Sequence, residues 1–253
     1  MTARPSSAQR TNNKEHGGGV RSLPSIAGDD AAARYGTGRA VTQSLAPKVD
    51  EGYAREVAAR FVAARNTPRS PEVRAAYMAL QEQSDTAFRL MTGGGAKSPI
   101  RVMFTHCATP YASDDEMISA VRATRLLEVT TCAIGRDRHH PLLGNERGGA
   151  YDRFRAVHDI VGHVCSGLRF DRDGELGAWL TQDRLYTGVA RVALGTELHG
   201  EHSVCWTTGR VAEHKATLLD RSVLARARRG ACFRLLTEEG EASPERPLEK
   251  RGT

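Results

Sequence analysis

The sequence has few aromatic residues and no long apolar run. Phe, Trp and Tyr make up 6% of the 253 residues, and the basic-plus-aromatic runs that build stacking platforms for nucleic-acid bases are missing. An apolar stretch of about 18 residues, the length typical of a membrane-spanning helix, is also missing. No segment resembles a secretory signal peptide. These absences predict a cytoplasmic protein without a membrane partner.

Cysteine is scarce and neither sign of charge dominates. The five cysteines are widely spaced and form no CxxC pair, which argues against a zinc ribbon and against a thioredoxin-like motif. The formal net charge is +6 and the sequence pI is about 9.3. Because the excess arginine is dispersed along the chain, it favours solubility and anionic small molecules more than nucleic acid.

Hydrophobic periodicity predicts a mainly α-helical fold of the α+β type, with one or two short strands. Residues 1–49 and 231–253 are predicted to be disordered tails on a single helical metal-binding domain at residues 50–230. Capping signals and apolar spacing predict helices at 51–65, 70–91, 113–127, from about 150, 175–199 and 211–229, and strands at 100–105 and 129–134.

Two histidines, His158 and His163, stand five residues apart in an apolar segment that is predicted to be helical. Imidazole is the commonest metal ligand in proteins. On a regular helix the two side chains point about 140° apart, which is too far round for both to bind one ion. The helix must therefore end, kink or bulge between them, and Gly162 is the residue that would permit this.

A carboxylate, Glu197, lies on the apolar face of the next predicted helix, with Ala190 and Ala193. A charge buried there requires a cation or strong hydrogen-bond donors. Two imidazoles and one carboxylate form the facial triad of non-heme iron(II) oxygenases, and the same donors bind catalytic zinc. The sequence thus predicts a metal site of His158, His163 and Glu197 between two core helices.

The segment 158–163, His-Asp-Ile-Val-Gly-His, resembles the His-Glu-Leu-Leu-Gly-His motif of the pterin-dependent aromatic amino acid hydroxylases. In that family both histidines, and a glutamate a few dozen residues later, bind iron. The resemblance therefore implies Fe(II) at His158, His163 and Glu197. The acid after the first histidine is shorter here, and no segment matches the pterin site, so the resemblance leaves both pterin and an aromatic substrate open.

A broader resemblance, to a group of uncharacterised bacterial and phage-encoded proteins, covers residues 140–220. It is carried by the segments 140–143, 154–159, 162–163, 174–175 and 196–197 and by Gly200. It implies one shared structural unit that ends near Asp220, and it brings no activity with it.

Five other residues are candidates for the site. Asp159 and Glu201 could orient a ligand or handle protons, although Asp159 could equally be a capping or solvated acid. Arg155 could bind an anionic group or form a surface ion pair. Trp179 and Tyr186 could contact a substrate or belong to the core.

Three further residues could be additional ligands. Glu175 could bind a metal, or it could be an acid that interacts with the helix dipole at a helix start. His139 and His140 lie in the loop before the motif.

Two other classes of protein remain open. Residues 158–163 also resemble the His-Asp-Ile-Gly-His phrase of HD-type phosphohydrolases, with one residue inserted, and such an enzyme would add His106 or His139 and Asp220 as ligands. A structural or partner-binding, phage-like protein would use a metal only to hold helices together. The favoured expectation is a non-heme iron oxygenase that acts with dioxygen on a small, amino-acid-like substrate, with zinc as the alternative metal.

Overall fold

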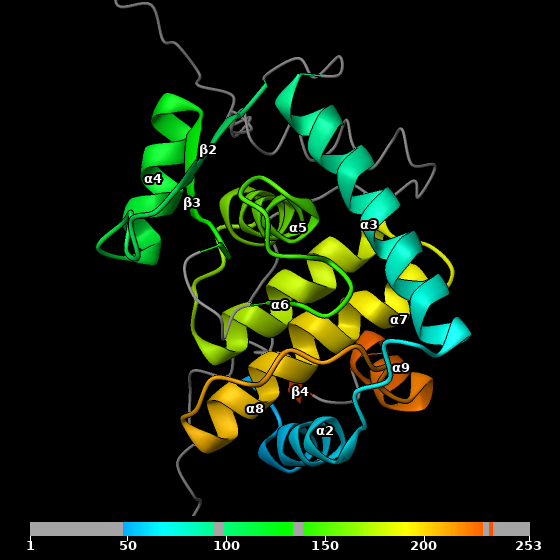
Figure 1. Cartoon of the computed structure of the whole chain (residues 1–253). Coiled ribbons are helices and arrows are strands. Elements are labelled where there is room, and N and C mark those ends of the chain that lie inside the picture. Colours follow the sequence, from blue (N-terminus) through cyan, green and yellow to red (C-terminus); the bar gives the residue numbers. More distant parts are fainter. Residues whose placement is uncertain (1–47, 94–98, 134–138, 230–232, 235–253) are drawn as a thin grey trace, which may run out of the picture.

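The computed structural model describes residues 48–93, 99–133, 139–229 and 233–234 (Figure 1). The fold is mainly α-helical, as predicted, with two small pairs of strands. In chain order the elements are β1 (Lys48–Val49), α2 (Glu51–Ala63), α3 (Pro71–Thr92), β2 (Arg101–Thr105), α4 (Asp114–Thr124), β3 (Leu126–Thr130), α5 (Ala150–His158), the π-helix η2 (Asp159–Cys165), α6 (Arg172–Gln182), the 3-10 turn η3 (Asp183–Leu185), α7 (Ala190–Gly195), the π-helix η4 (Thr196–Gly200), α8 (Glu201–Thr208), α9 (Arg221–Arg228) and β4 (Phe233–Arg234).

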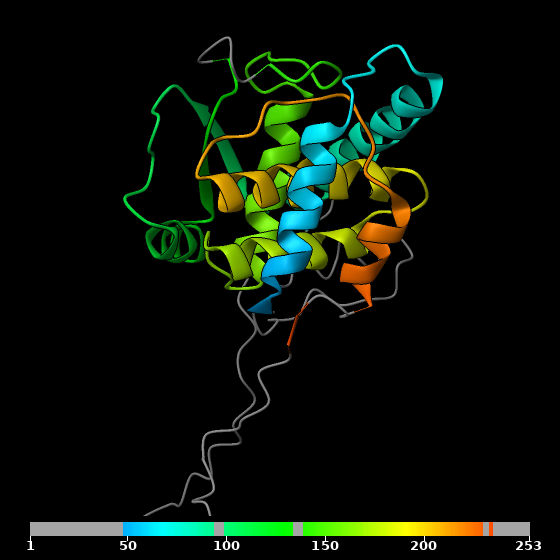
Figure 2. The same cartoon turned by 90° about the horizontal axis from the view of Figure 1, so that it is seen from below.

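Helix α5 lies near the centre of the molecule, where Figure 1 shows it almost end-on. Helix α3 packs against α5 and α7, and α6 packs against η2. Helix α2 crosses the outer side of α8 and η4, as Figure 2 shows from below. The parallel pair β2–β3, with α4, covers the side of the core formed by α5 and η2. The two π-helices are therefore enclosed by helices.

Short polar side chains begin several of these helices, as the sequence predicts. Asp50 accepts a hydrogen bond from the backbone N–H of Tyr53 at 2.7 Å at the start of α2. Asp171 does the same for Gly174 at 2.7 Å at the start of α6. Each side chain satisfies an amide that has no partner inside its helix. The cap at Asp171 sets where α6 begins, and α6 carries one of the site residues.

An ion-pair cluster fixes α9 against the end of α6. The buried carboxylate of Asp183 accepts from Arg228 at 2.8 Å and 3.0 Å, and it also pairs with Arg191. The guanidinium of Arg228 lies over the ring of Trp179, 5.5 Å from its centroid. These contacts anchor the C-terminal helix on the core.

The predicted helix at 175–199 is wrong as one continuous element. Helix α6 ends at Gln182, and the chain turns through Tyr186, whose backbone is extended, and Gly188, whose φ is +59°. Left-handed backbone suits glycine and breaks a helix. As a consequence, Glu175 and Glu197 lie on different helices.

Other predicted boundaries shift as well. Strand β3 is Leu126–Thr130 rather than 129–134, and of the predicted helix at 211–229 only α9 is helical. The ends predicted to be tails include β1 and β4, which pair antiparallel. The rest of both predicted tails lies outside the described residues. Within the described ranges, no helix is both long and apolar enough to cross a membrane.

Candidate metal centre

The predicted break in the helix at Gly162 is confirmed, because α5 continues as the π-helix η2 from Asp159 to Cys165. A π-helix bonds each residue to the fifth one along the chain, so residues five apart come onto the same side. The Nε2 atoms of His158 and His163 accordingly lie 3.1 Å apart, with the rings at 89° to each other.

Glycine at position 162 is required for space. A Cβ atom at Gly162 would lie 2.9 Å from Cβ of Ala178 and 3.2 Å from Nδ1 of His158. Backbone freedom was the predicted reason for a glycine here, whereas the structure also shows a close approach of α6 to the π-helix. Gly162 therefore lets both the helix and the imidazole come close.

The outer nitrogens of the two imidazoles both face acceptors. Nδ1 of His158 lies 2.9 Å from Oε1 of Gln182, and Nδ1 of His163 lies 2.9 Å from the carbonyl oxygen of Leu168. Gln182 is itself held by the hydroxyl of Tyr186, which also bonds Ser84. With Nδ1 as the donor in both rings, both Nε2 lone pairs point inward.

Glu175 in the first turn of α6 completes the group. Its Oε2 atom lies 3.3 Å from Nε2 of His158 and 3.6 Å from Nε2 of His163. Donors held about 2.1 Å from one metal ion are about 3.0 Å apart at a right angle and about 3.4 Å apart at the tetrahedral angle. His158, His163 and Glu175 therefore have the spacing of three ligands of one ion.

The charges in this group support an ionised carboxylate. Burial opposes ionisation of Glu175, but the charges and hydrogen bonds of His202, His158 and His163 outweigh it and hold the pKa of Glu175 well below its usual range. Burial likewise opposes protonation of His158, and the hydrogen bond and charge of Glu175 outweigh that effect and raise the pKa of His158. The histidines and Glu175 thus stabilise opposite charges on each other.

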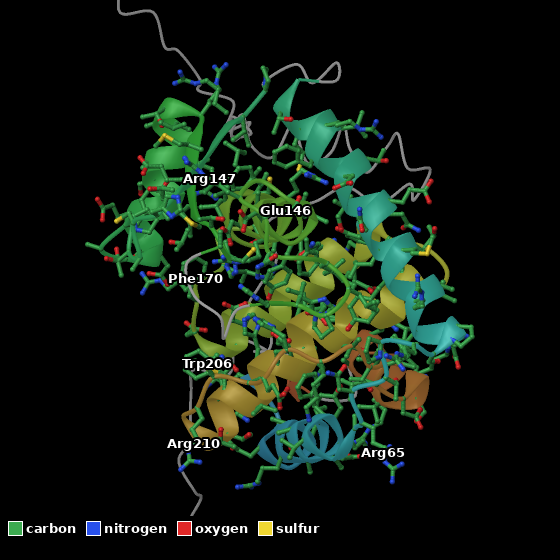
Figure 3. All side chains as sticks on the ribbon, viewed as in Figure 1. Arg65, Glu146, Arg147, Phe170, Trp206 and Arg210 are labelled. Carbon is green, nitrogen blue, oxygen red and sulfur yellow. The ribbon has the colours of Figure 1, made fainter. Side chains whose placement is uncertain are left out.

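The group reaches solvent on the side of α8. Nδ1 of His202 lies 3.2 Å from Oε2 of Glu175, and 35% of its side chain is exposed. His202, Glu175, Arg172 and Trp206 line a small cavity. Phe170, whose ring meets that of His163 edge-on, is partly exposed, and Figure 3 shows Phe170 and Trp206 on the same side of the molecule. The site is buried but has one open side.

The predicted third ligand, Glu197, lies in a different group. Its Oε1 accepts a hydrogen bond from Tyr77 and lies 3.2 Å from Nε2 of His140. Each of Glu197, Glu201 and His214 places one donor atom within 4.8 Å of the other two. Glu175 therefore takes the position that the sequence assigned to Glu197, and Glu197 belongs to a second buried cluster.

The two carboxylates of this second cluster have opposite pKa shifts. Burial raises the pKa of Glu201 well above its usual range, and the charge of Glu197 adds to this effect. Burial also opposes ionisation of Glu197, but His140, Tyr77 and His214 outweigh it and lower its pKa. The same buried surroundings thus shift the pKa values of the two carboxyl groups in opposite directions.

The three residues predicted as substrate contacts make contacts within the protein. Arg155 donates to the carbonyl oxygen of Thr130 at 2.6 Å, at the end of β3. Trp179 is fully buried and stacks on His199 with ring centroids 4.7 Å apart. Tyr186 is 2% exposed and acts through Gln182 on the orientation of His158. Trp179 and Tyr186 are thus core residues.

The remaining candidates separate into near and remote residues. Asp159 begins η2 and is half-buried; burial raises its pKa, and it is not part of the ligand group. His139 is exposed and contacts Asn145, and His106 is also exposed. Asp220 caps α9 at the surface. The additional ligands of an HD-type site are therefore not brought to His158.

Glu175 was predicted only as a possible additional ligand, and His214 was not predicted as a site residue. Glu175 did have a signal, since it follows a capping aspartate and a glycine directly at a helix start. His214 lies between α8 and α9, in a segment that was predicted to be part of a helix at 211–229 but is irregular, so helical periodicity could not indicate where its side chain points.

Comparison with known proteins finds no family, no curated protein and no solved structure that matches this chain.

Proposed function

We propose that this protein is a metal-dependent enzyme in which His158, His163 and Glu175 hold one divalent metal ion. The observation that carries the proposal is the orientation of the two imidazoles. Both Nδ1 atoms face acceptors, so two Nε2 lone pairs and a carboxylate oxygen converge within 3.1–3.6 Å. Such electron-rich atoms repel one another unless a cation lies among them.

Iron(II) is the metal we propose, in a non-heme oxygenase. Two histidines and one carboxylate, with positions left open, are typical of iron(II) oxygenases. Bound iron(II) would supply the activation of dioxygen. The chain would supply the orientation of the ligands, because Gln182 and Leu168 orient the imidazoles. The partly exposed His202 can move protons between solvent and Glu175.

An enzymatic role is favoured over a structural metal by the exposure of the group. Structural sites are closed by four protein ligands, whereas catalytic sites keep an open position. Here the side chains of His158 and Glu175 are 9% and 11% exposed, on the side where His202 reaches solvent. The substrate proposed for this opening is a small molecule.

Metal analysis of protein purified without oxygen and reconstituted with iron(II) tests the proposal. We expect that His163→Ala and Glu175→Gln each lower the iron content by one ion per chain, and that both abolish substrate-dependent oxygen uptake. His139→Ala is the matched control, because His139 is an exposed histidine of the preceding loop, and it should change neither. Unchanged iron content in both ligand variants would refute the site, and oxygen uptake should be sought across amino-acid and nucleotide pools.

A further inference from the structure

Glu197, Glu201 and His214 gather at a second place in the core, apart from His158 and His163. They come from η4, from the first residue of α8 and from the segment that follows α8. Nδ1 of His214 lies 2.8 Å from Oε1 of Glu201. Their side chains are 1%, 14% and 12% exposed. Two carboxylates and one imidazole are thus held together with little contact with water.

The hydrogen bonds of Glu197 leave one of its oxygens available. Oε1 accepts from Tyr77 and faces Nε2 of His140. Nδ1 of His140 accepts from the amides of Leu142 and Leu143 at 3.1 Å and 2.9 Å, so the ring proton is on Nε2, which lies 3.2 Å from Oε1 of Glu197 but makes no hydrogen bond among the described residues. Oε2 of Glu197 is buried and has no hydrogen-bond partner among the described residues. A buried acceptor without a partner is costly.

We propose that Glu197, Glu201 and His214 form a second divalent-cation site, of the manganese or iron class. One divalent ion would neutralise both carboxylates, give Oε2 of Glu197 a partner and offset the repulsion between two buried acids. Carboxylate oxygens suit manganese and magnesium, and an imidazole shifts the preference toward the transition metals. Tyr77 and His140 then orient Glu197 through Oε1.

The two sites share helix α8. Consecutive residues at its start serve both: Glu201 belongs to the second cluster and His202 contacts Glu175 of the first. Adjacent helical residues point about 100° apart, so Glu201 and His202 face different sides of α8, and each side carries one of the two sites.

Equilibrium dialysis against Mn²⁺, with metal content measured by mass spectrometry, tests the second site. We expect wild-type protein to bind two ions per chain. His214→Gln and Glu201→Gln should each lower the affinity for one of the two ions by at least about 100-fold. Changes to residues that merely orient ligands already lower metal affinity by about 10- to 100-fold. Glu213→Gln, a charge-matched change at an exposed residue beside His214, should retain both ions.

The outcomes separate this site from the first. Loss of one ion in His163→Ala and of the other in His214→Gln supports both sites. Loss in His214→Gln alone supports the second site and refutes the first. A wild-type protein that binds a single ion, lost in His163→Ala, overturns the second site and identifies the cluster as a hydrogen-bonded network. This last result needs no variant of the second cluster, so a folding failure of His214→Gln cannot hide it.

In the His163→Ala background, Mn²⁺ should still raise the Tm, and this rise should vanish on adding His214→Gln.

Discussion

The side-chain amide of Gln182 determines which nitrogen of His158 points inward. Its Oε1 lies 2.9 Å from Nδ1 of His158, and its Nε2 is held by Tyr186. Groups that orient a ligand in this way are generally worth about 10- to 100-fold in metal affinity. The fine geometry of the candidate centre therefore depends on residues that never touch a metal.

Replacing Gln182 by leucine removes the acceptor and keeps a similar volume. We expect Gln182→Leu to lower metal affinity by about 10- to 100-fold, measured by competition with a coloured chelator. Gln182→Glu, which keeps an acceptor oxygen, should retain the affinity. Equal weakening in both variants would show that the effect is one of packing.

His199 has a separate effect, on stability. It is 5% exposed, stacks on Trp179 and bonds the hydroxyl of Tyr53. Burial, and then the charges of His202 and Arg228, lower the pKa of His199 to about 3. The folded protein thus keeps His199 neutral at a pH where the unfolded chain binds a proton.

The free energy of unfolding should fall by about 1.4 kcal/mol per pH unit as the pH drops below about 6.5. It falls because only the unfolded state gains a proton at His199 in this range. The loss continues down to pH 3, where folded His199 also titrates. Urea unfolding of metal-free protein at several pH values measures the slope. In His199→Gln the slope should be smaller by this amount, whereas equal slopes would contradict the assignment.

At the scale of elements, the close contact between η2 and α6 holds the histidines and Glu175 in one place. Gly162 faces Ala178 across this contact. A methyl group at position 162 must push the helices apart or displace the ring of His158, and either movement alters the ligand spacing. Helix packing and the spacing of the two imidazoles and Glu175 are thus coupled at one residue.

Gly162→Ala should cost about 1–3 kcal/mol of stability, as overpacking of a core does, and it should also weaken metal binding. Denaturant unfolding and metal titration measure the two effects. Adding Ala178→Gly should restore part of the stability and part of the metal affinity, because it removes the opposing Cβ. Gly93→Ala is the control, since a Cβ at Gly93 meets nothing within 4 Å.

At the scale of the whole molecule, buried thiols can report on opening of the core. Cys132 and Cys165 are buried, whereas Cys107 is exposed. Burial, with a contribution from Asp152, raises the pKa of Cys132 to about 12, so its thiol is neutral and unreactive in the folded state. Reaction at Cys132 therefore requires the core to open.

Metal should slow this reaction. In a variant whose other cysteines are alanine, Cys132 labelling by a thiol reagent should slow about 100-fold when the metal is at about 100 times its Kd, because binding to the folded state adds about 2.7 kcal/mol. His163→Ala should reduce the protection. Labelling that is fast and independent of metal would show that Cys132 is reached without unfolding.

Local sequence signals anticipated much of the fold. Ser70 and Ser113 each cap a helix where the sequence predicted a helix start. A cap forms hydrogen bonds within one turn of the chain, so distant contacts have little influence on where the helix begins. The incompatibility of His158 and His163 with a regular helix was also a local property, and it correctly predicted an irregular backbone at Gly162.

The partner of the histidines was decided by the tertiary structure. Periodicity shows which face of a helix is apolar, but it does not show which neighbouring helix that face meets. A turn at Gly188 divides the segment that was expected to be one helix, so Glu175 reaches the histidines from α6 while Glu197 meets Glu201 and His214 elsewhere. The sequence by itself determined that His158 and His163 lie in a buried segment whose helix is irregular. Which carboxylate joins them, and that the other acid belongs to a second cluster, depended on long-range packing between helices.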